Sequence, residues 1–152
     1  MNPPKLFDEW NTVKKAIQDR KTLHFKEREI FFIAVGVNVG HEIDGKGDKS
    51  LHPVLVFKKI NNHLFFGIPL TSTIREGDAY FSFEFKQGKT SCAMLSQLRV
   101  FSTKRVEYRS GWMSINDFEV LFKKLESYII PTRFTPPAEA RRVVPKECER
   151  VL

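Results

Sequence analysis

A histidine and two adjacent hydroxyl residues are the side chains best suited to proton transfer and anion binding. His52 stands before Pro53 at the start of an apolar run. A histidine titrates at about pH 6.5 when unperturbed, so it can serve as an acid or a base. Thr71 and Ser72 follow a second apolar run, and short hydroxyls at a strand end can donate to phosphate oxygens. On the residues alone, a partly buried histidine at a strand start and an ordinary turn opening remain open as alternatives.

Three other polar residues could take part in the same chemistry. His41 lies beside Glu42, whose carboxylate could hold the tautomer of the ring or raise its pKa, although two solvated loop residues are an equal alternative. Gln97 and Arg99 are two positions apart in a predicted strand, which places their side chains on one face. Arg99 could bind phosphate or pair with a carboxylate of the fold.

Periodicity predicts the elements that must position these residues. Apolar residues spaced by three and four predict an amphipathic helix over residues 4–20, and Ser114 as N-cap begins a second helix that Pro131 ends. Residues 36–50 form a charged loop with four glycines. Short runs rich in aromatic and β-branched residues predict strands over 30–35, 53–57, 63–68, 80–85 and 91–100.

Several short strands closed by a helix indicate an α+β, mainly β, barrel-like sheet. We expect three parts: an N-terminal helix and connector over 1–27, a barrel domain with a C-terminal helix over 28–130, and a basic tail containing prolines over 131–152.

The charge of the chain favours an anionic partner. The 152 residues carry a formal net charge of +7, which is typical of proteins that bind nucleic acid, an acidic protein or a membrane surface, although a merely soluble basic protein is the alternative. Basic residues could form an electrostatic track, and aromatic residues near them could stack on a base, although core packing is favoured for the aromatics. These are Lys58, Lys59, Lys104, Arg105 and Arg109, with Tyr108 and Trp112.

The cysteines and the N-terminus bear on the compartment. Two cysteines, Cys92 and Cys148, are too few for a disulfide framework and lack metal-ligand spacing, so a reducing cytoplasm is expected. Cys92 is expected in the core. No stretch approaches the roughly 18 apolar residues of a spanning helix, and no secretory signal is recognised, so no membrane role is expected.

Five short patches occur in a fixed order: Arg28–Phe32, Gly40–Glu42, His52–Val56, Ile68–Ser72 and Leu95–Arg99. In this order they resemble the PemK/MazF family, the toxin half of type II toxin–antitoxin systems, over roughly residues 28–125. Members are small ribonucleases that cut messenger RNA without a metal. The resemblance implies an SH3-like barrel that forms a homodimer, and a cognate antitoxin whose acidic segment fills the RNA site.

The resemblance also implies roles for particular residues. His52, Thr71 and His41 would be catalytic, and Ser72, Gln97 and Arg99 would bind RNA, with neither metal nor cofactor. The chain departs from the family at two positions, since His52 stands where an Arg is usual and Ser96 where some relatives have an acidic residue.

Three functions from different classes follow. The first is a toxin-type endoribonuclease that cleaves single-stranded RNA through attack of the 2′-hydroxyl on the adjacent phosphate. The second is a catalytically impaired barrel that binds RNA or an acidic protein partner. The third is an SH3-like domain that binds peptides in an aromatic groove.

Overall fold

Apolar runs separated by glycine and asparagine turns fold into one curled antiparallel sheet. The structure is a computed structural model and describes residues 3–131. The strands are β1 Glu29–Ala34, β2 Leu51–Lys59, β3 Leu64–Thr71, β4 Tyr80–Lys86, β5 Lys89–Met94, β6 Arg99–Ser102 and β7 Val106–Trp112. Their order in space is β4-β5-β3-β2-β1-β7, with β6 paired to β3.

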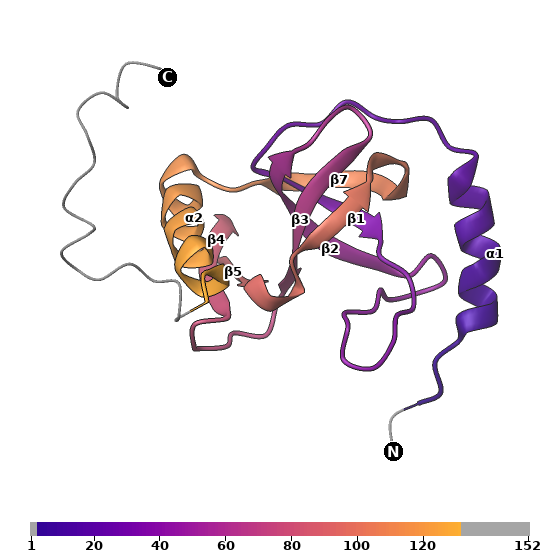
Figure 1. The fold of residues 1–152 in the computed structure, drawn as a ribbon, viewed down its shortest axis with the longest axis horizontal. Coiled ribbons are helices and arrows are strands. Elements are labelled where there is room, and N and C mark those ends of the chain that lie inside the picture. Colours follow the sequence, from indigo (N-terminus) through magenta and orange to yellow (C-terminus); the bar gives the residue numbers. More distant parts are fainter. Residues whose placement is uncertain (1–2, 132–152) are drawn as a thin grey trace.

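Two helices lie at opposite ends of the sheet, as Figure 1 shows. They are α1 Phe7–Gln18 and α2 Ile115–Ile129. This arrangement confirms the predicted α+β, mainly β, class with an N-terminal and a C-terminal helix.

The core has three parts: one under α2, a second formed by the strands together with Phe25, and a small third part under α1. Leu121 and Leu125 of α2 pack with Ile30, Leu55 and Ile68 of the central strands in the first part. The second part is aromatic and includes Phe25, Phe31, Phe65 and Phe101. Cys92 is buried, as predicted, whereas Cys148 and the predicted tail after Pro131 lie outside the described residues.

Helix α2 begins as the sequence predicts. The hydroxyl oxygen of Ser114 accepts a hydrogen bond from the backbone N–H of Asp117 at 3.1 Å, which satisfies one free donor of the first turn. Leu121 and Leu125 are buried, but Phe122 and Ile129 of the same predicted apolar face are 50% and 54% exposed.

Helix α1 packs on the edge where β1 ends and β2 begins. Trp10 and Ile17 are buried there against Ala34, with Val13 and Leu51 beside them. The predicted helix over 4–20 is therefore confirmed in its centre and shorter at both ends. The predicted loop over 36–50 is also confirmed, and the backbones of Lys46 and Leu51 close it with bonds of 2.8 and 2.9 Å.

The predicted single strand over residues 91–100 is wrong. Strand β5 ends at Met94, a turn of 3₁₀ helix spans Leu95–Gln97, and β6 begins at Arg99. Gln97 is therefore not in extended backbone, and the period-two argument that placed its side chain on the face of Arg99 does not hold.

The last strand and its aromatic residues also differ from expectation. No strand was predicted over residues 106–112, because its serine, glycine and charged residues weaken the alternating pattern. Tyr108 and Trp112 of this strand are 51% and 57% exposed, so core packing was the wrong interpretation for both.

Within the described residues, no helix combines the length and the apolar character that crossing a membrane requires.

Candidate functional site

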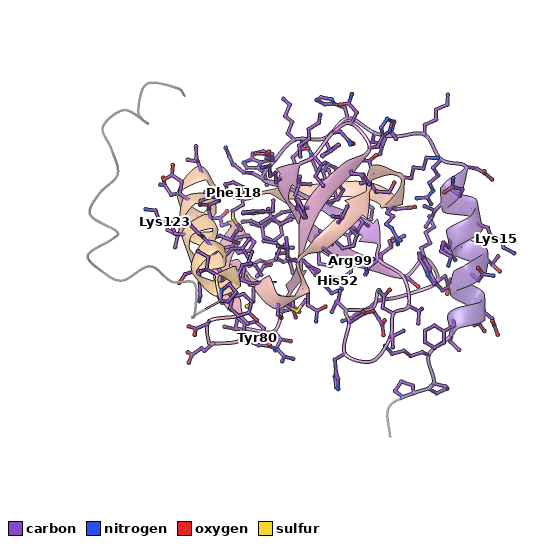
Figure 2. All side chains as sticks on the ribbon, in the orientation of Figure 1. Lys15, His52, Tyr80, Arg99, Phe118 and Lys123 are labelled. Atoms are coloured by element: carbon purple, nitrogen blue, oxygen red, sulfur yellow. The ribbon has the colours of Figure 1, made fainter. Side chains whose placement is uncertain are left out.

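A cavity of about 730 Å³ opens where β2 begins and β3 ends, beside the β4–β5 hairpin. His52, which lines it, lies in the middle of the molecule between the two helices (Figure 2). The lining combines one histidine, several hydroxyls, aromatic rings and three lysines, and residues 3–131 contribute no carboxylate to it. Its residues are Phe32, Lys46, Leu51, His52, Pro53, Leu70, Thr71, Ser72, Phe85, Lys86, Gly88, Lys89, Thr90, Ser91, Tyr108 and Ser110.

Antiparallel register brings these residues together. In the β1–β2 pair, His52 lies opposite Ile33 and Pro53 opposite Phe32. In the β2–β3 pair, Val54 lies opposite Pro69, so the end of β3 at Thr71 comes beside the beginning of β2. His52 and Thr71, which are 19 positions apart in sequence, are thereby brought side by side in the lining of the cavity.

His52 is a buried residue in the lining of this cavity. It is only 6% exposed, and no group in residues 3–131 makes a hydrogen bond with its Nε2 atom. Burial lowers the pKa of His52 below 6.5, a backbone hydrogen bond with Leu70 opposes the change, and the charge of Lys46 adds to it. The lowered pKa favours the neutral imidazole at pH 7, which is the form that can accept a proton.

Two hydroxyls stand at the end of β3 beside His52. The Oγ1 atom of Thr71 accepts a hydrogen bond from the backbone N–H of Thr73 at 3.2 Å. This bond uses a lone pair of the oxygen and leaves the hydroxyl proton available for another acceptor. Ser72 follows in the chain and is exposed. The predicted set His52, Thr71 and Ser72 therefore lines a single cavity.

The three lysines of the cavity were not singled out from the sequence. Lys86 and Lys89 end and begin the strands of the β4–β5 hairpin, and Lys46 comes from the loop over 36–50. The Nζ atom of Lys86 donates to Ser110 Oγ at 3.1 Å. Lysines on both sides of a short turn were visible in the sequence, but only the fold reveals that the hairpin lies against β7.

The other predicted residues, His41, Gln97 and Arg99, do not line this cavity. The Gln97 side chain accepts from the backbone N–H of Ile43 at 3.1 Å and donates to the carbonyl of His41 at 3.2 Å, so it holds the loop. The guanidinium of Arg99 lies over the ring of Phe101 at 5.0 Å.

The basic residues of the predicted electrostatic track also lie outside the lining. Arg105 donates to the carbonyls of Ala34 and Val35, and Arg109 pairs with Glu29 at 3.2 Å. Lys104 donates from Nζ to the carbonyl of Gln18 at 2.6 Å, and Lys59 lies over the ring of Phe25 at 4.8 Å, so four of the five residues that the sequence grouped make contacts within the fold.

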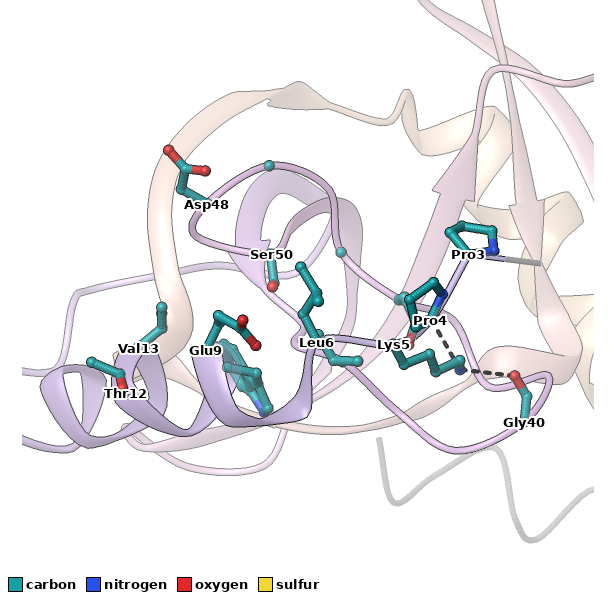
Figure 3. A pocket seen from close by; sticks show the side chains of 15 residues that line it. Pro3, Pro4, Lys5, Leu6, Glu9, Thr12, Val13, Gly40, Asp48 and Ser50 are labelled. Atoms are coloured by element: carbon teal, nitrogen blue, oxygen red, sulfur yellow. Dashed lines mark hydrogen bonds and ion pairs between the residues drawn. The ribbon is translucent and has the colours of Figure 1, made fainter. Parts of the chain in front are cut away.

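A second cavity, of about 920 Å³, lies between α1 and the loop over 36–50 (Figure 3). Its lining includes Glu9, Asp44 and Asp48, so it suits a polyanion less than the cavity at His52. Lys5 donates from Nζ to the carbonyl of Gly40 at 2.9 Å and pairs with Asp44 at 3.0 Å. This contact joins the segment before α1 to the loop.

Metal-binding side chains do not gather anywhere in residues 3–131. No three His, Cys, Asp or Glu residues of that range lie close enough together to hold an ion.

Comparisons with known proteins bear on the family and the fold. A family model described as PemK-like, MazF-like toxin of type II toxin–antitoxin system matches residues 26–129. A comparison with curated protein sequences found no match.

Solved structures with this fold include three toxins or endoribonucleases. The Mycobacterium tuberculosis toxin MazF-mt6 has a TM-score of 0.50 at 11% identity, over 66% of this chain and 94% of that chain. An endoribonuclease in complex with its cognate antitoxin, from a mycobacterial species, has a TM-score of 0.55 at 9% identity, over 75% and 100%. MazF from Deinococcus radiodurans has a TM-score of 0.54 at 15% identity, over 72% and 98%.

The region matched by the family model begins before β1 and ends with α2, so it contains the whole sheet and every residue that lines the cavity at His52. Since that region is more than half of the chain, this protein belongs to the PemK-like, MazF-like toxins of type II toxin–antitoxin systems.

Proposed function

We propose that this chain is an endoribonuclease that cleaves single-stranded RNA without a metal, through attack of the 2′-hydroxyl on the adjacent phosphate. The family is known for endoribonucleases. The observation that supports the proposal most is the lining of the cavity at His52, which has three lysines, a neutral histidine and no carboxylate.

Each part of the lining suits one requirement of the reaction. His52 would take the proton of the 2′-hydroxyl as general base, since burial lowers its pKa and favours the neutral ring at pH 7. The hydroxyls of Thr71 and Ser72 would donate to the non-bridging oxygens, where negative charge gathers. The ammonium groups of Lys46, Lys86 and Lys89 would supply positive charge to the strand.

The step balances without an external reagent other than water. The bond from the 2′-oxygen to phosphorus forms, and the bond from phosphorus to the 5′-oxygen breaks. The 2′-proton goes to His52, and the leaving 5′-oxygen takes a proton from a lysine ammonium or from water. The products are a 2′,3′-cyclic phosphate and a 5′-hydroxyl.

The alternative is a barrel that binds RNA or an acidic protein partner without cleavage. Two observations favour it. His52 is 6% exposed, which restricts its contact with substrate, and Ser96, at the position of an acid in some relatives, cannot transfer a proton at neutral pH. The same lysines would serve binding alone.

We further propose that the chain acts in the cytoplasm as a homodimer under the control of an antitoxin with an acidic segment. One solved relative in fold is a complex with its cognate antitoxin. A cavity with three lysines and no carboxylate is complementary to an acidic segment. Val120, Phe122 and Ile129 of α2 are each at least 50% exposed and could be covered in such assemblies.

The test is incubation of the purified protein with a long single-stranded RNA in EDTA, followed by mapping of the product ends. We expect cuts with 2′,3′-cyclic phosphate ends. The variants His52→Gln and Thr71→Ala should lower the cleavage rate by about 10²-fold or more, the size typical of lost acid–base or charge-stabilising groups.

Two control variants distinguish an effect at the cavity from a general effect of changing exposed side chains. Thr73→Ala changes an exposed threonine two residues from Thr71, and Lys123→Ala removes a lysine on α2 outside the cavity. Both should cleave like the wild type. A strict requirement for Mg²⁺ would contradict the proposal, and intact RNA with tight, salt-dependent binding would establish the alternative.

A further inference from the structure

Tyr108 on β7 carries an aromatic ring that is stacked on one side and open on the other. Its ring lies on that of Phe32 on β1, with centroids 4.9 Å apart and planes inclined by 21°. Tyr108 is 51% exposed, whereas Phe32 is only partly exposed, so Tyr108 is the outer ring of the pair. Because Phe32 already restricts the orientation of the Tyr108 ring, stacking a third ring on Tyr108 would cost little side-chain conformational entropy.

The sheet places this pair next to His52. Phe32 lies opposite Tyr108 in the β1–β7 pair and opposite Pro53 in the β1–β2 pair. Tyr108, Phe32 and Pro53 therefore form a row across three strands, about 10 Å long at the usual strand spacing. His52 is the residue before Pro53, and all four line the same cavity.

The charge around the pair indicates what would stack there. Lys86 reaches Ser110 on β7 at 3.1 Å, two residues from Tyr108, and Lys46 and Lys89 line the same cavity. Proteins bind single-stranded nucleic acids through two features: cationic side chains that contact the phosphates, and aromatic rings on which the bases stack. Both features occur together here. An acidic peptide would use the lysines but not the ring.

We propose that Tyr108, supported by Phe32, is a stacking subsite for one unpaired nucleobase flanking the phosphate that binds at His52, Thr71 and Ser72. The subsite rests on the proposed function. It accepts the face of any base, because every base has a π-face, and it excludes a base that is paired within a duplex. Its ligand is one nucleotide of a single-stranded RNA, held by the ring at its base and by lysines at its phosphates.

The neighbouring aromatic on β7 supplies a matched control. Trp112 is 57% exposed but does not line the cavity. The guanidinium of Arg109 lies 5.8 Å from its ring, and the carboxylate of Glu29 pairs with that guanidinium. The guanidinium of Arg109 lies over the ring and its charge is already paired with Glu29, so we expect Trp112 not to bind RNA.

The experiment measures binding separately from cleavage. The probe is a short single-stranded oligoribonucleotide with 2′-O-methyl sugars, which cannot undergo attack by a 2′-hydroxyl, and a series of it with one abasic position each. We expect Tyr108→Leu to weaken binding about 5- to 150-fold, from the usual contribution of one stacked base. Tyr108→Phe should bind like the wild type, and so should Trp112→Leu.

An abasic scan identifies stacking as the cause. One abasic position should weaken binding by the wild type as much as Tyr108→Leu does, and Tyr108→Leu should then cause no further loss with that probe. Thermal unfolding of Tyr108→Leu checks that Phe32 and the sheet remain folded. Three results would each overturn the inference. Tyr108→Leu could bind as tightly as the wild type, or its loss of affinity could add to the loss from every abasic probe. The third is no measurable binding by the wild type at low salt.

Cleavage of unmodified RNA by the same proteins distinguishes the two proposals. If the wild type cleaves and Tyr108→Leu binds and cleaves equally well, the proposed function stands and the subsite fails. If the wild type binds with the expected coupling but never cleaves, the subsite stands and the catalytic proposal fails.

Discussion

Acidification from pH 7.5 to 5.5 should weaken folding through His52. Burial disfavours the charged imidazolium and lowers the pKa of His52 in the folded chain below 6.5. In the unfolded chain the ring is solvated and takes up its proton at a higher pH. The stability contributed by neutral His52 is therefore complete above pH 6.5 and is lost as the pH falls below 6.5 toward the folded-state pKa.

The change in unfolding free energy has an upper limit, because only one proton is bound. Between the two pKa values the free energy of unfolding falls by at most about 1.4 kcal/mol per pH unit. For a chain of this size the urea dependence is about 1–3 kcal/mol per molar, so the urea midpoint should fall by at most roughly 0.5–1.4 M per pH unit. His52 is 6% exposed, and its Nε2 atom has no hydrogen-bond partner in the described part of the chain, so little solvent is available to offset the cost of a charge.

The assay is urea unfolding of the wild type and of His52→Gln at several pH values between 5.5 and 7.5. Glutamine stays neutral over this range, so the variant should lose most of the pH dependence, whatever its stability at neutral pH. His63→Gln, at an exposed position in the β2–β3 turn, is the control and should keep the dependence of the wild type. Equal slopes for wild type and His52→Gln would refute the argument.

Three further substitutions test the loop, the cavity and the core. Lys5→Ala removes the ion pair with Asp44, so hydrogen exchange in the loop over 36–50 should become faster, with a loss of global stability of about 1 kcal/mol or less. Lys89→Ala should weaken RNA binding and reduce the slope of log affinity against log salt by about 0.7, the value for one phosphate contact of a single strand. Gly67→Ala would place a Cβ 2.6 Å from Val54 Cγ1, and urea unfolding should show a loss of about 1–3 kcal/mol.

Much of the fold could be predicted because local pattern and tertiary environment agree there. The buried runs of β1 and β2 and the Asn61 turn produce a strand pair and a hairpin that a sequence argument can find. Asn61 Oδ1 accepts from the backbone N–H groups of His63 and Leu64 at 2.8 and 3.0 Å, the bonds for which asparagine is favoured in turns. The break at Leu95–Gln97 has no glycine or proline to mark it, so the apolar run concealed it.

The candidate site could be predicted only where its residues lie on two strands that are consecutive in sequence and pair with each other. His52, Thr71 and Ser72 lie at the start of one strand and the end of its neighbour, so a strand pair brings them together. Lys86 and Tyr108 reach the cavity from a hairpin and a last strand whose position depends on the curl of the whole sheet. Curl accumulates over many strands and has no local signature.

Helix α1 precedes the region that the family model matches, yet it fits the loop beside the site closely. A Cβ on Gly36 would stand 2.5 Å from the indole of Trp10, and Gly36 has a φ of +98°, so only glycine allows the helix this close. Leu51 packs with Trp10 on one side and lines the cavity at His52 on the other. Because Lys5 also holds the loop that carries Lys46, the N-terminal segment fixes one wall of the cavity from outside the barrel.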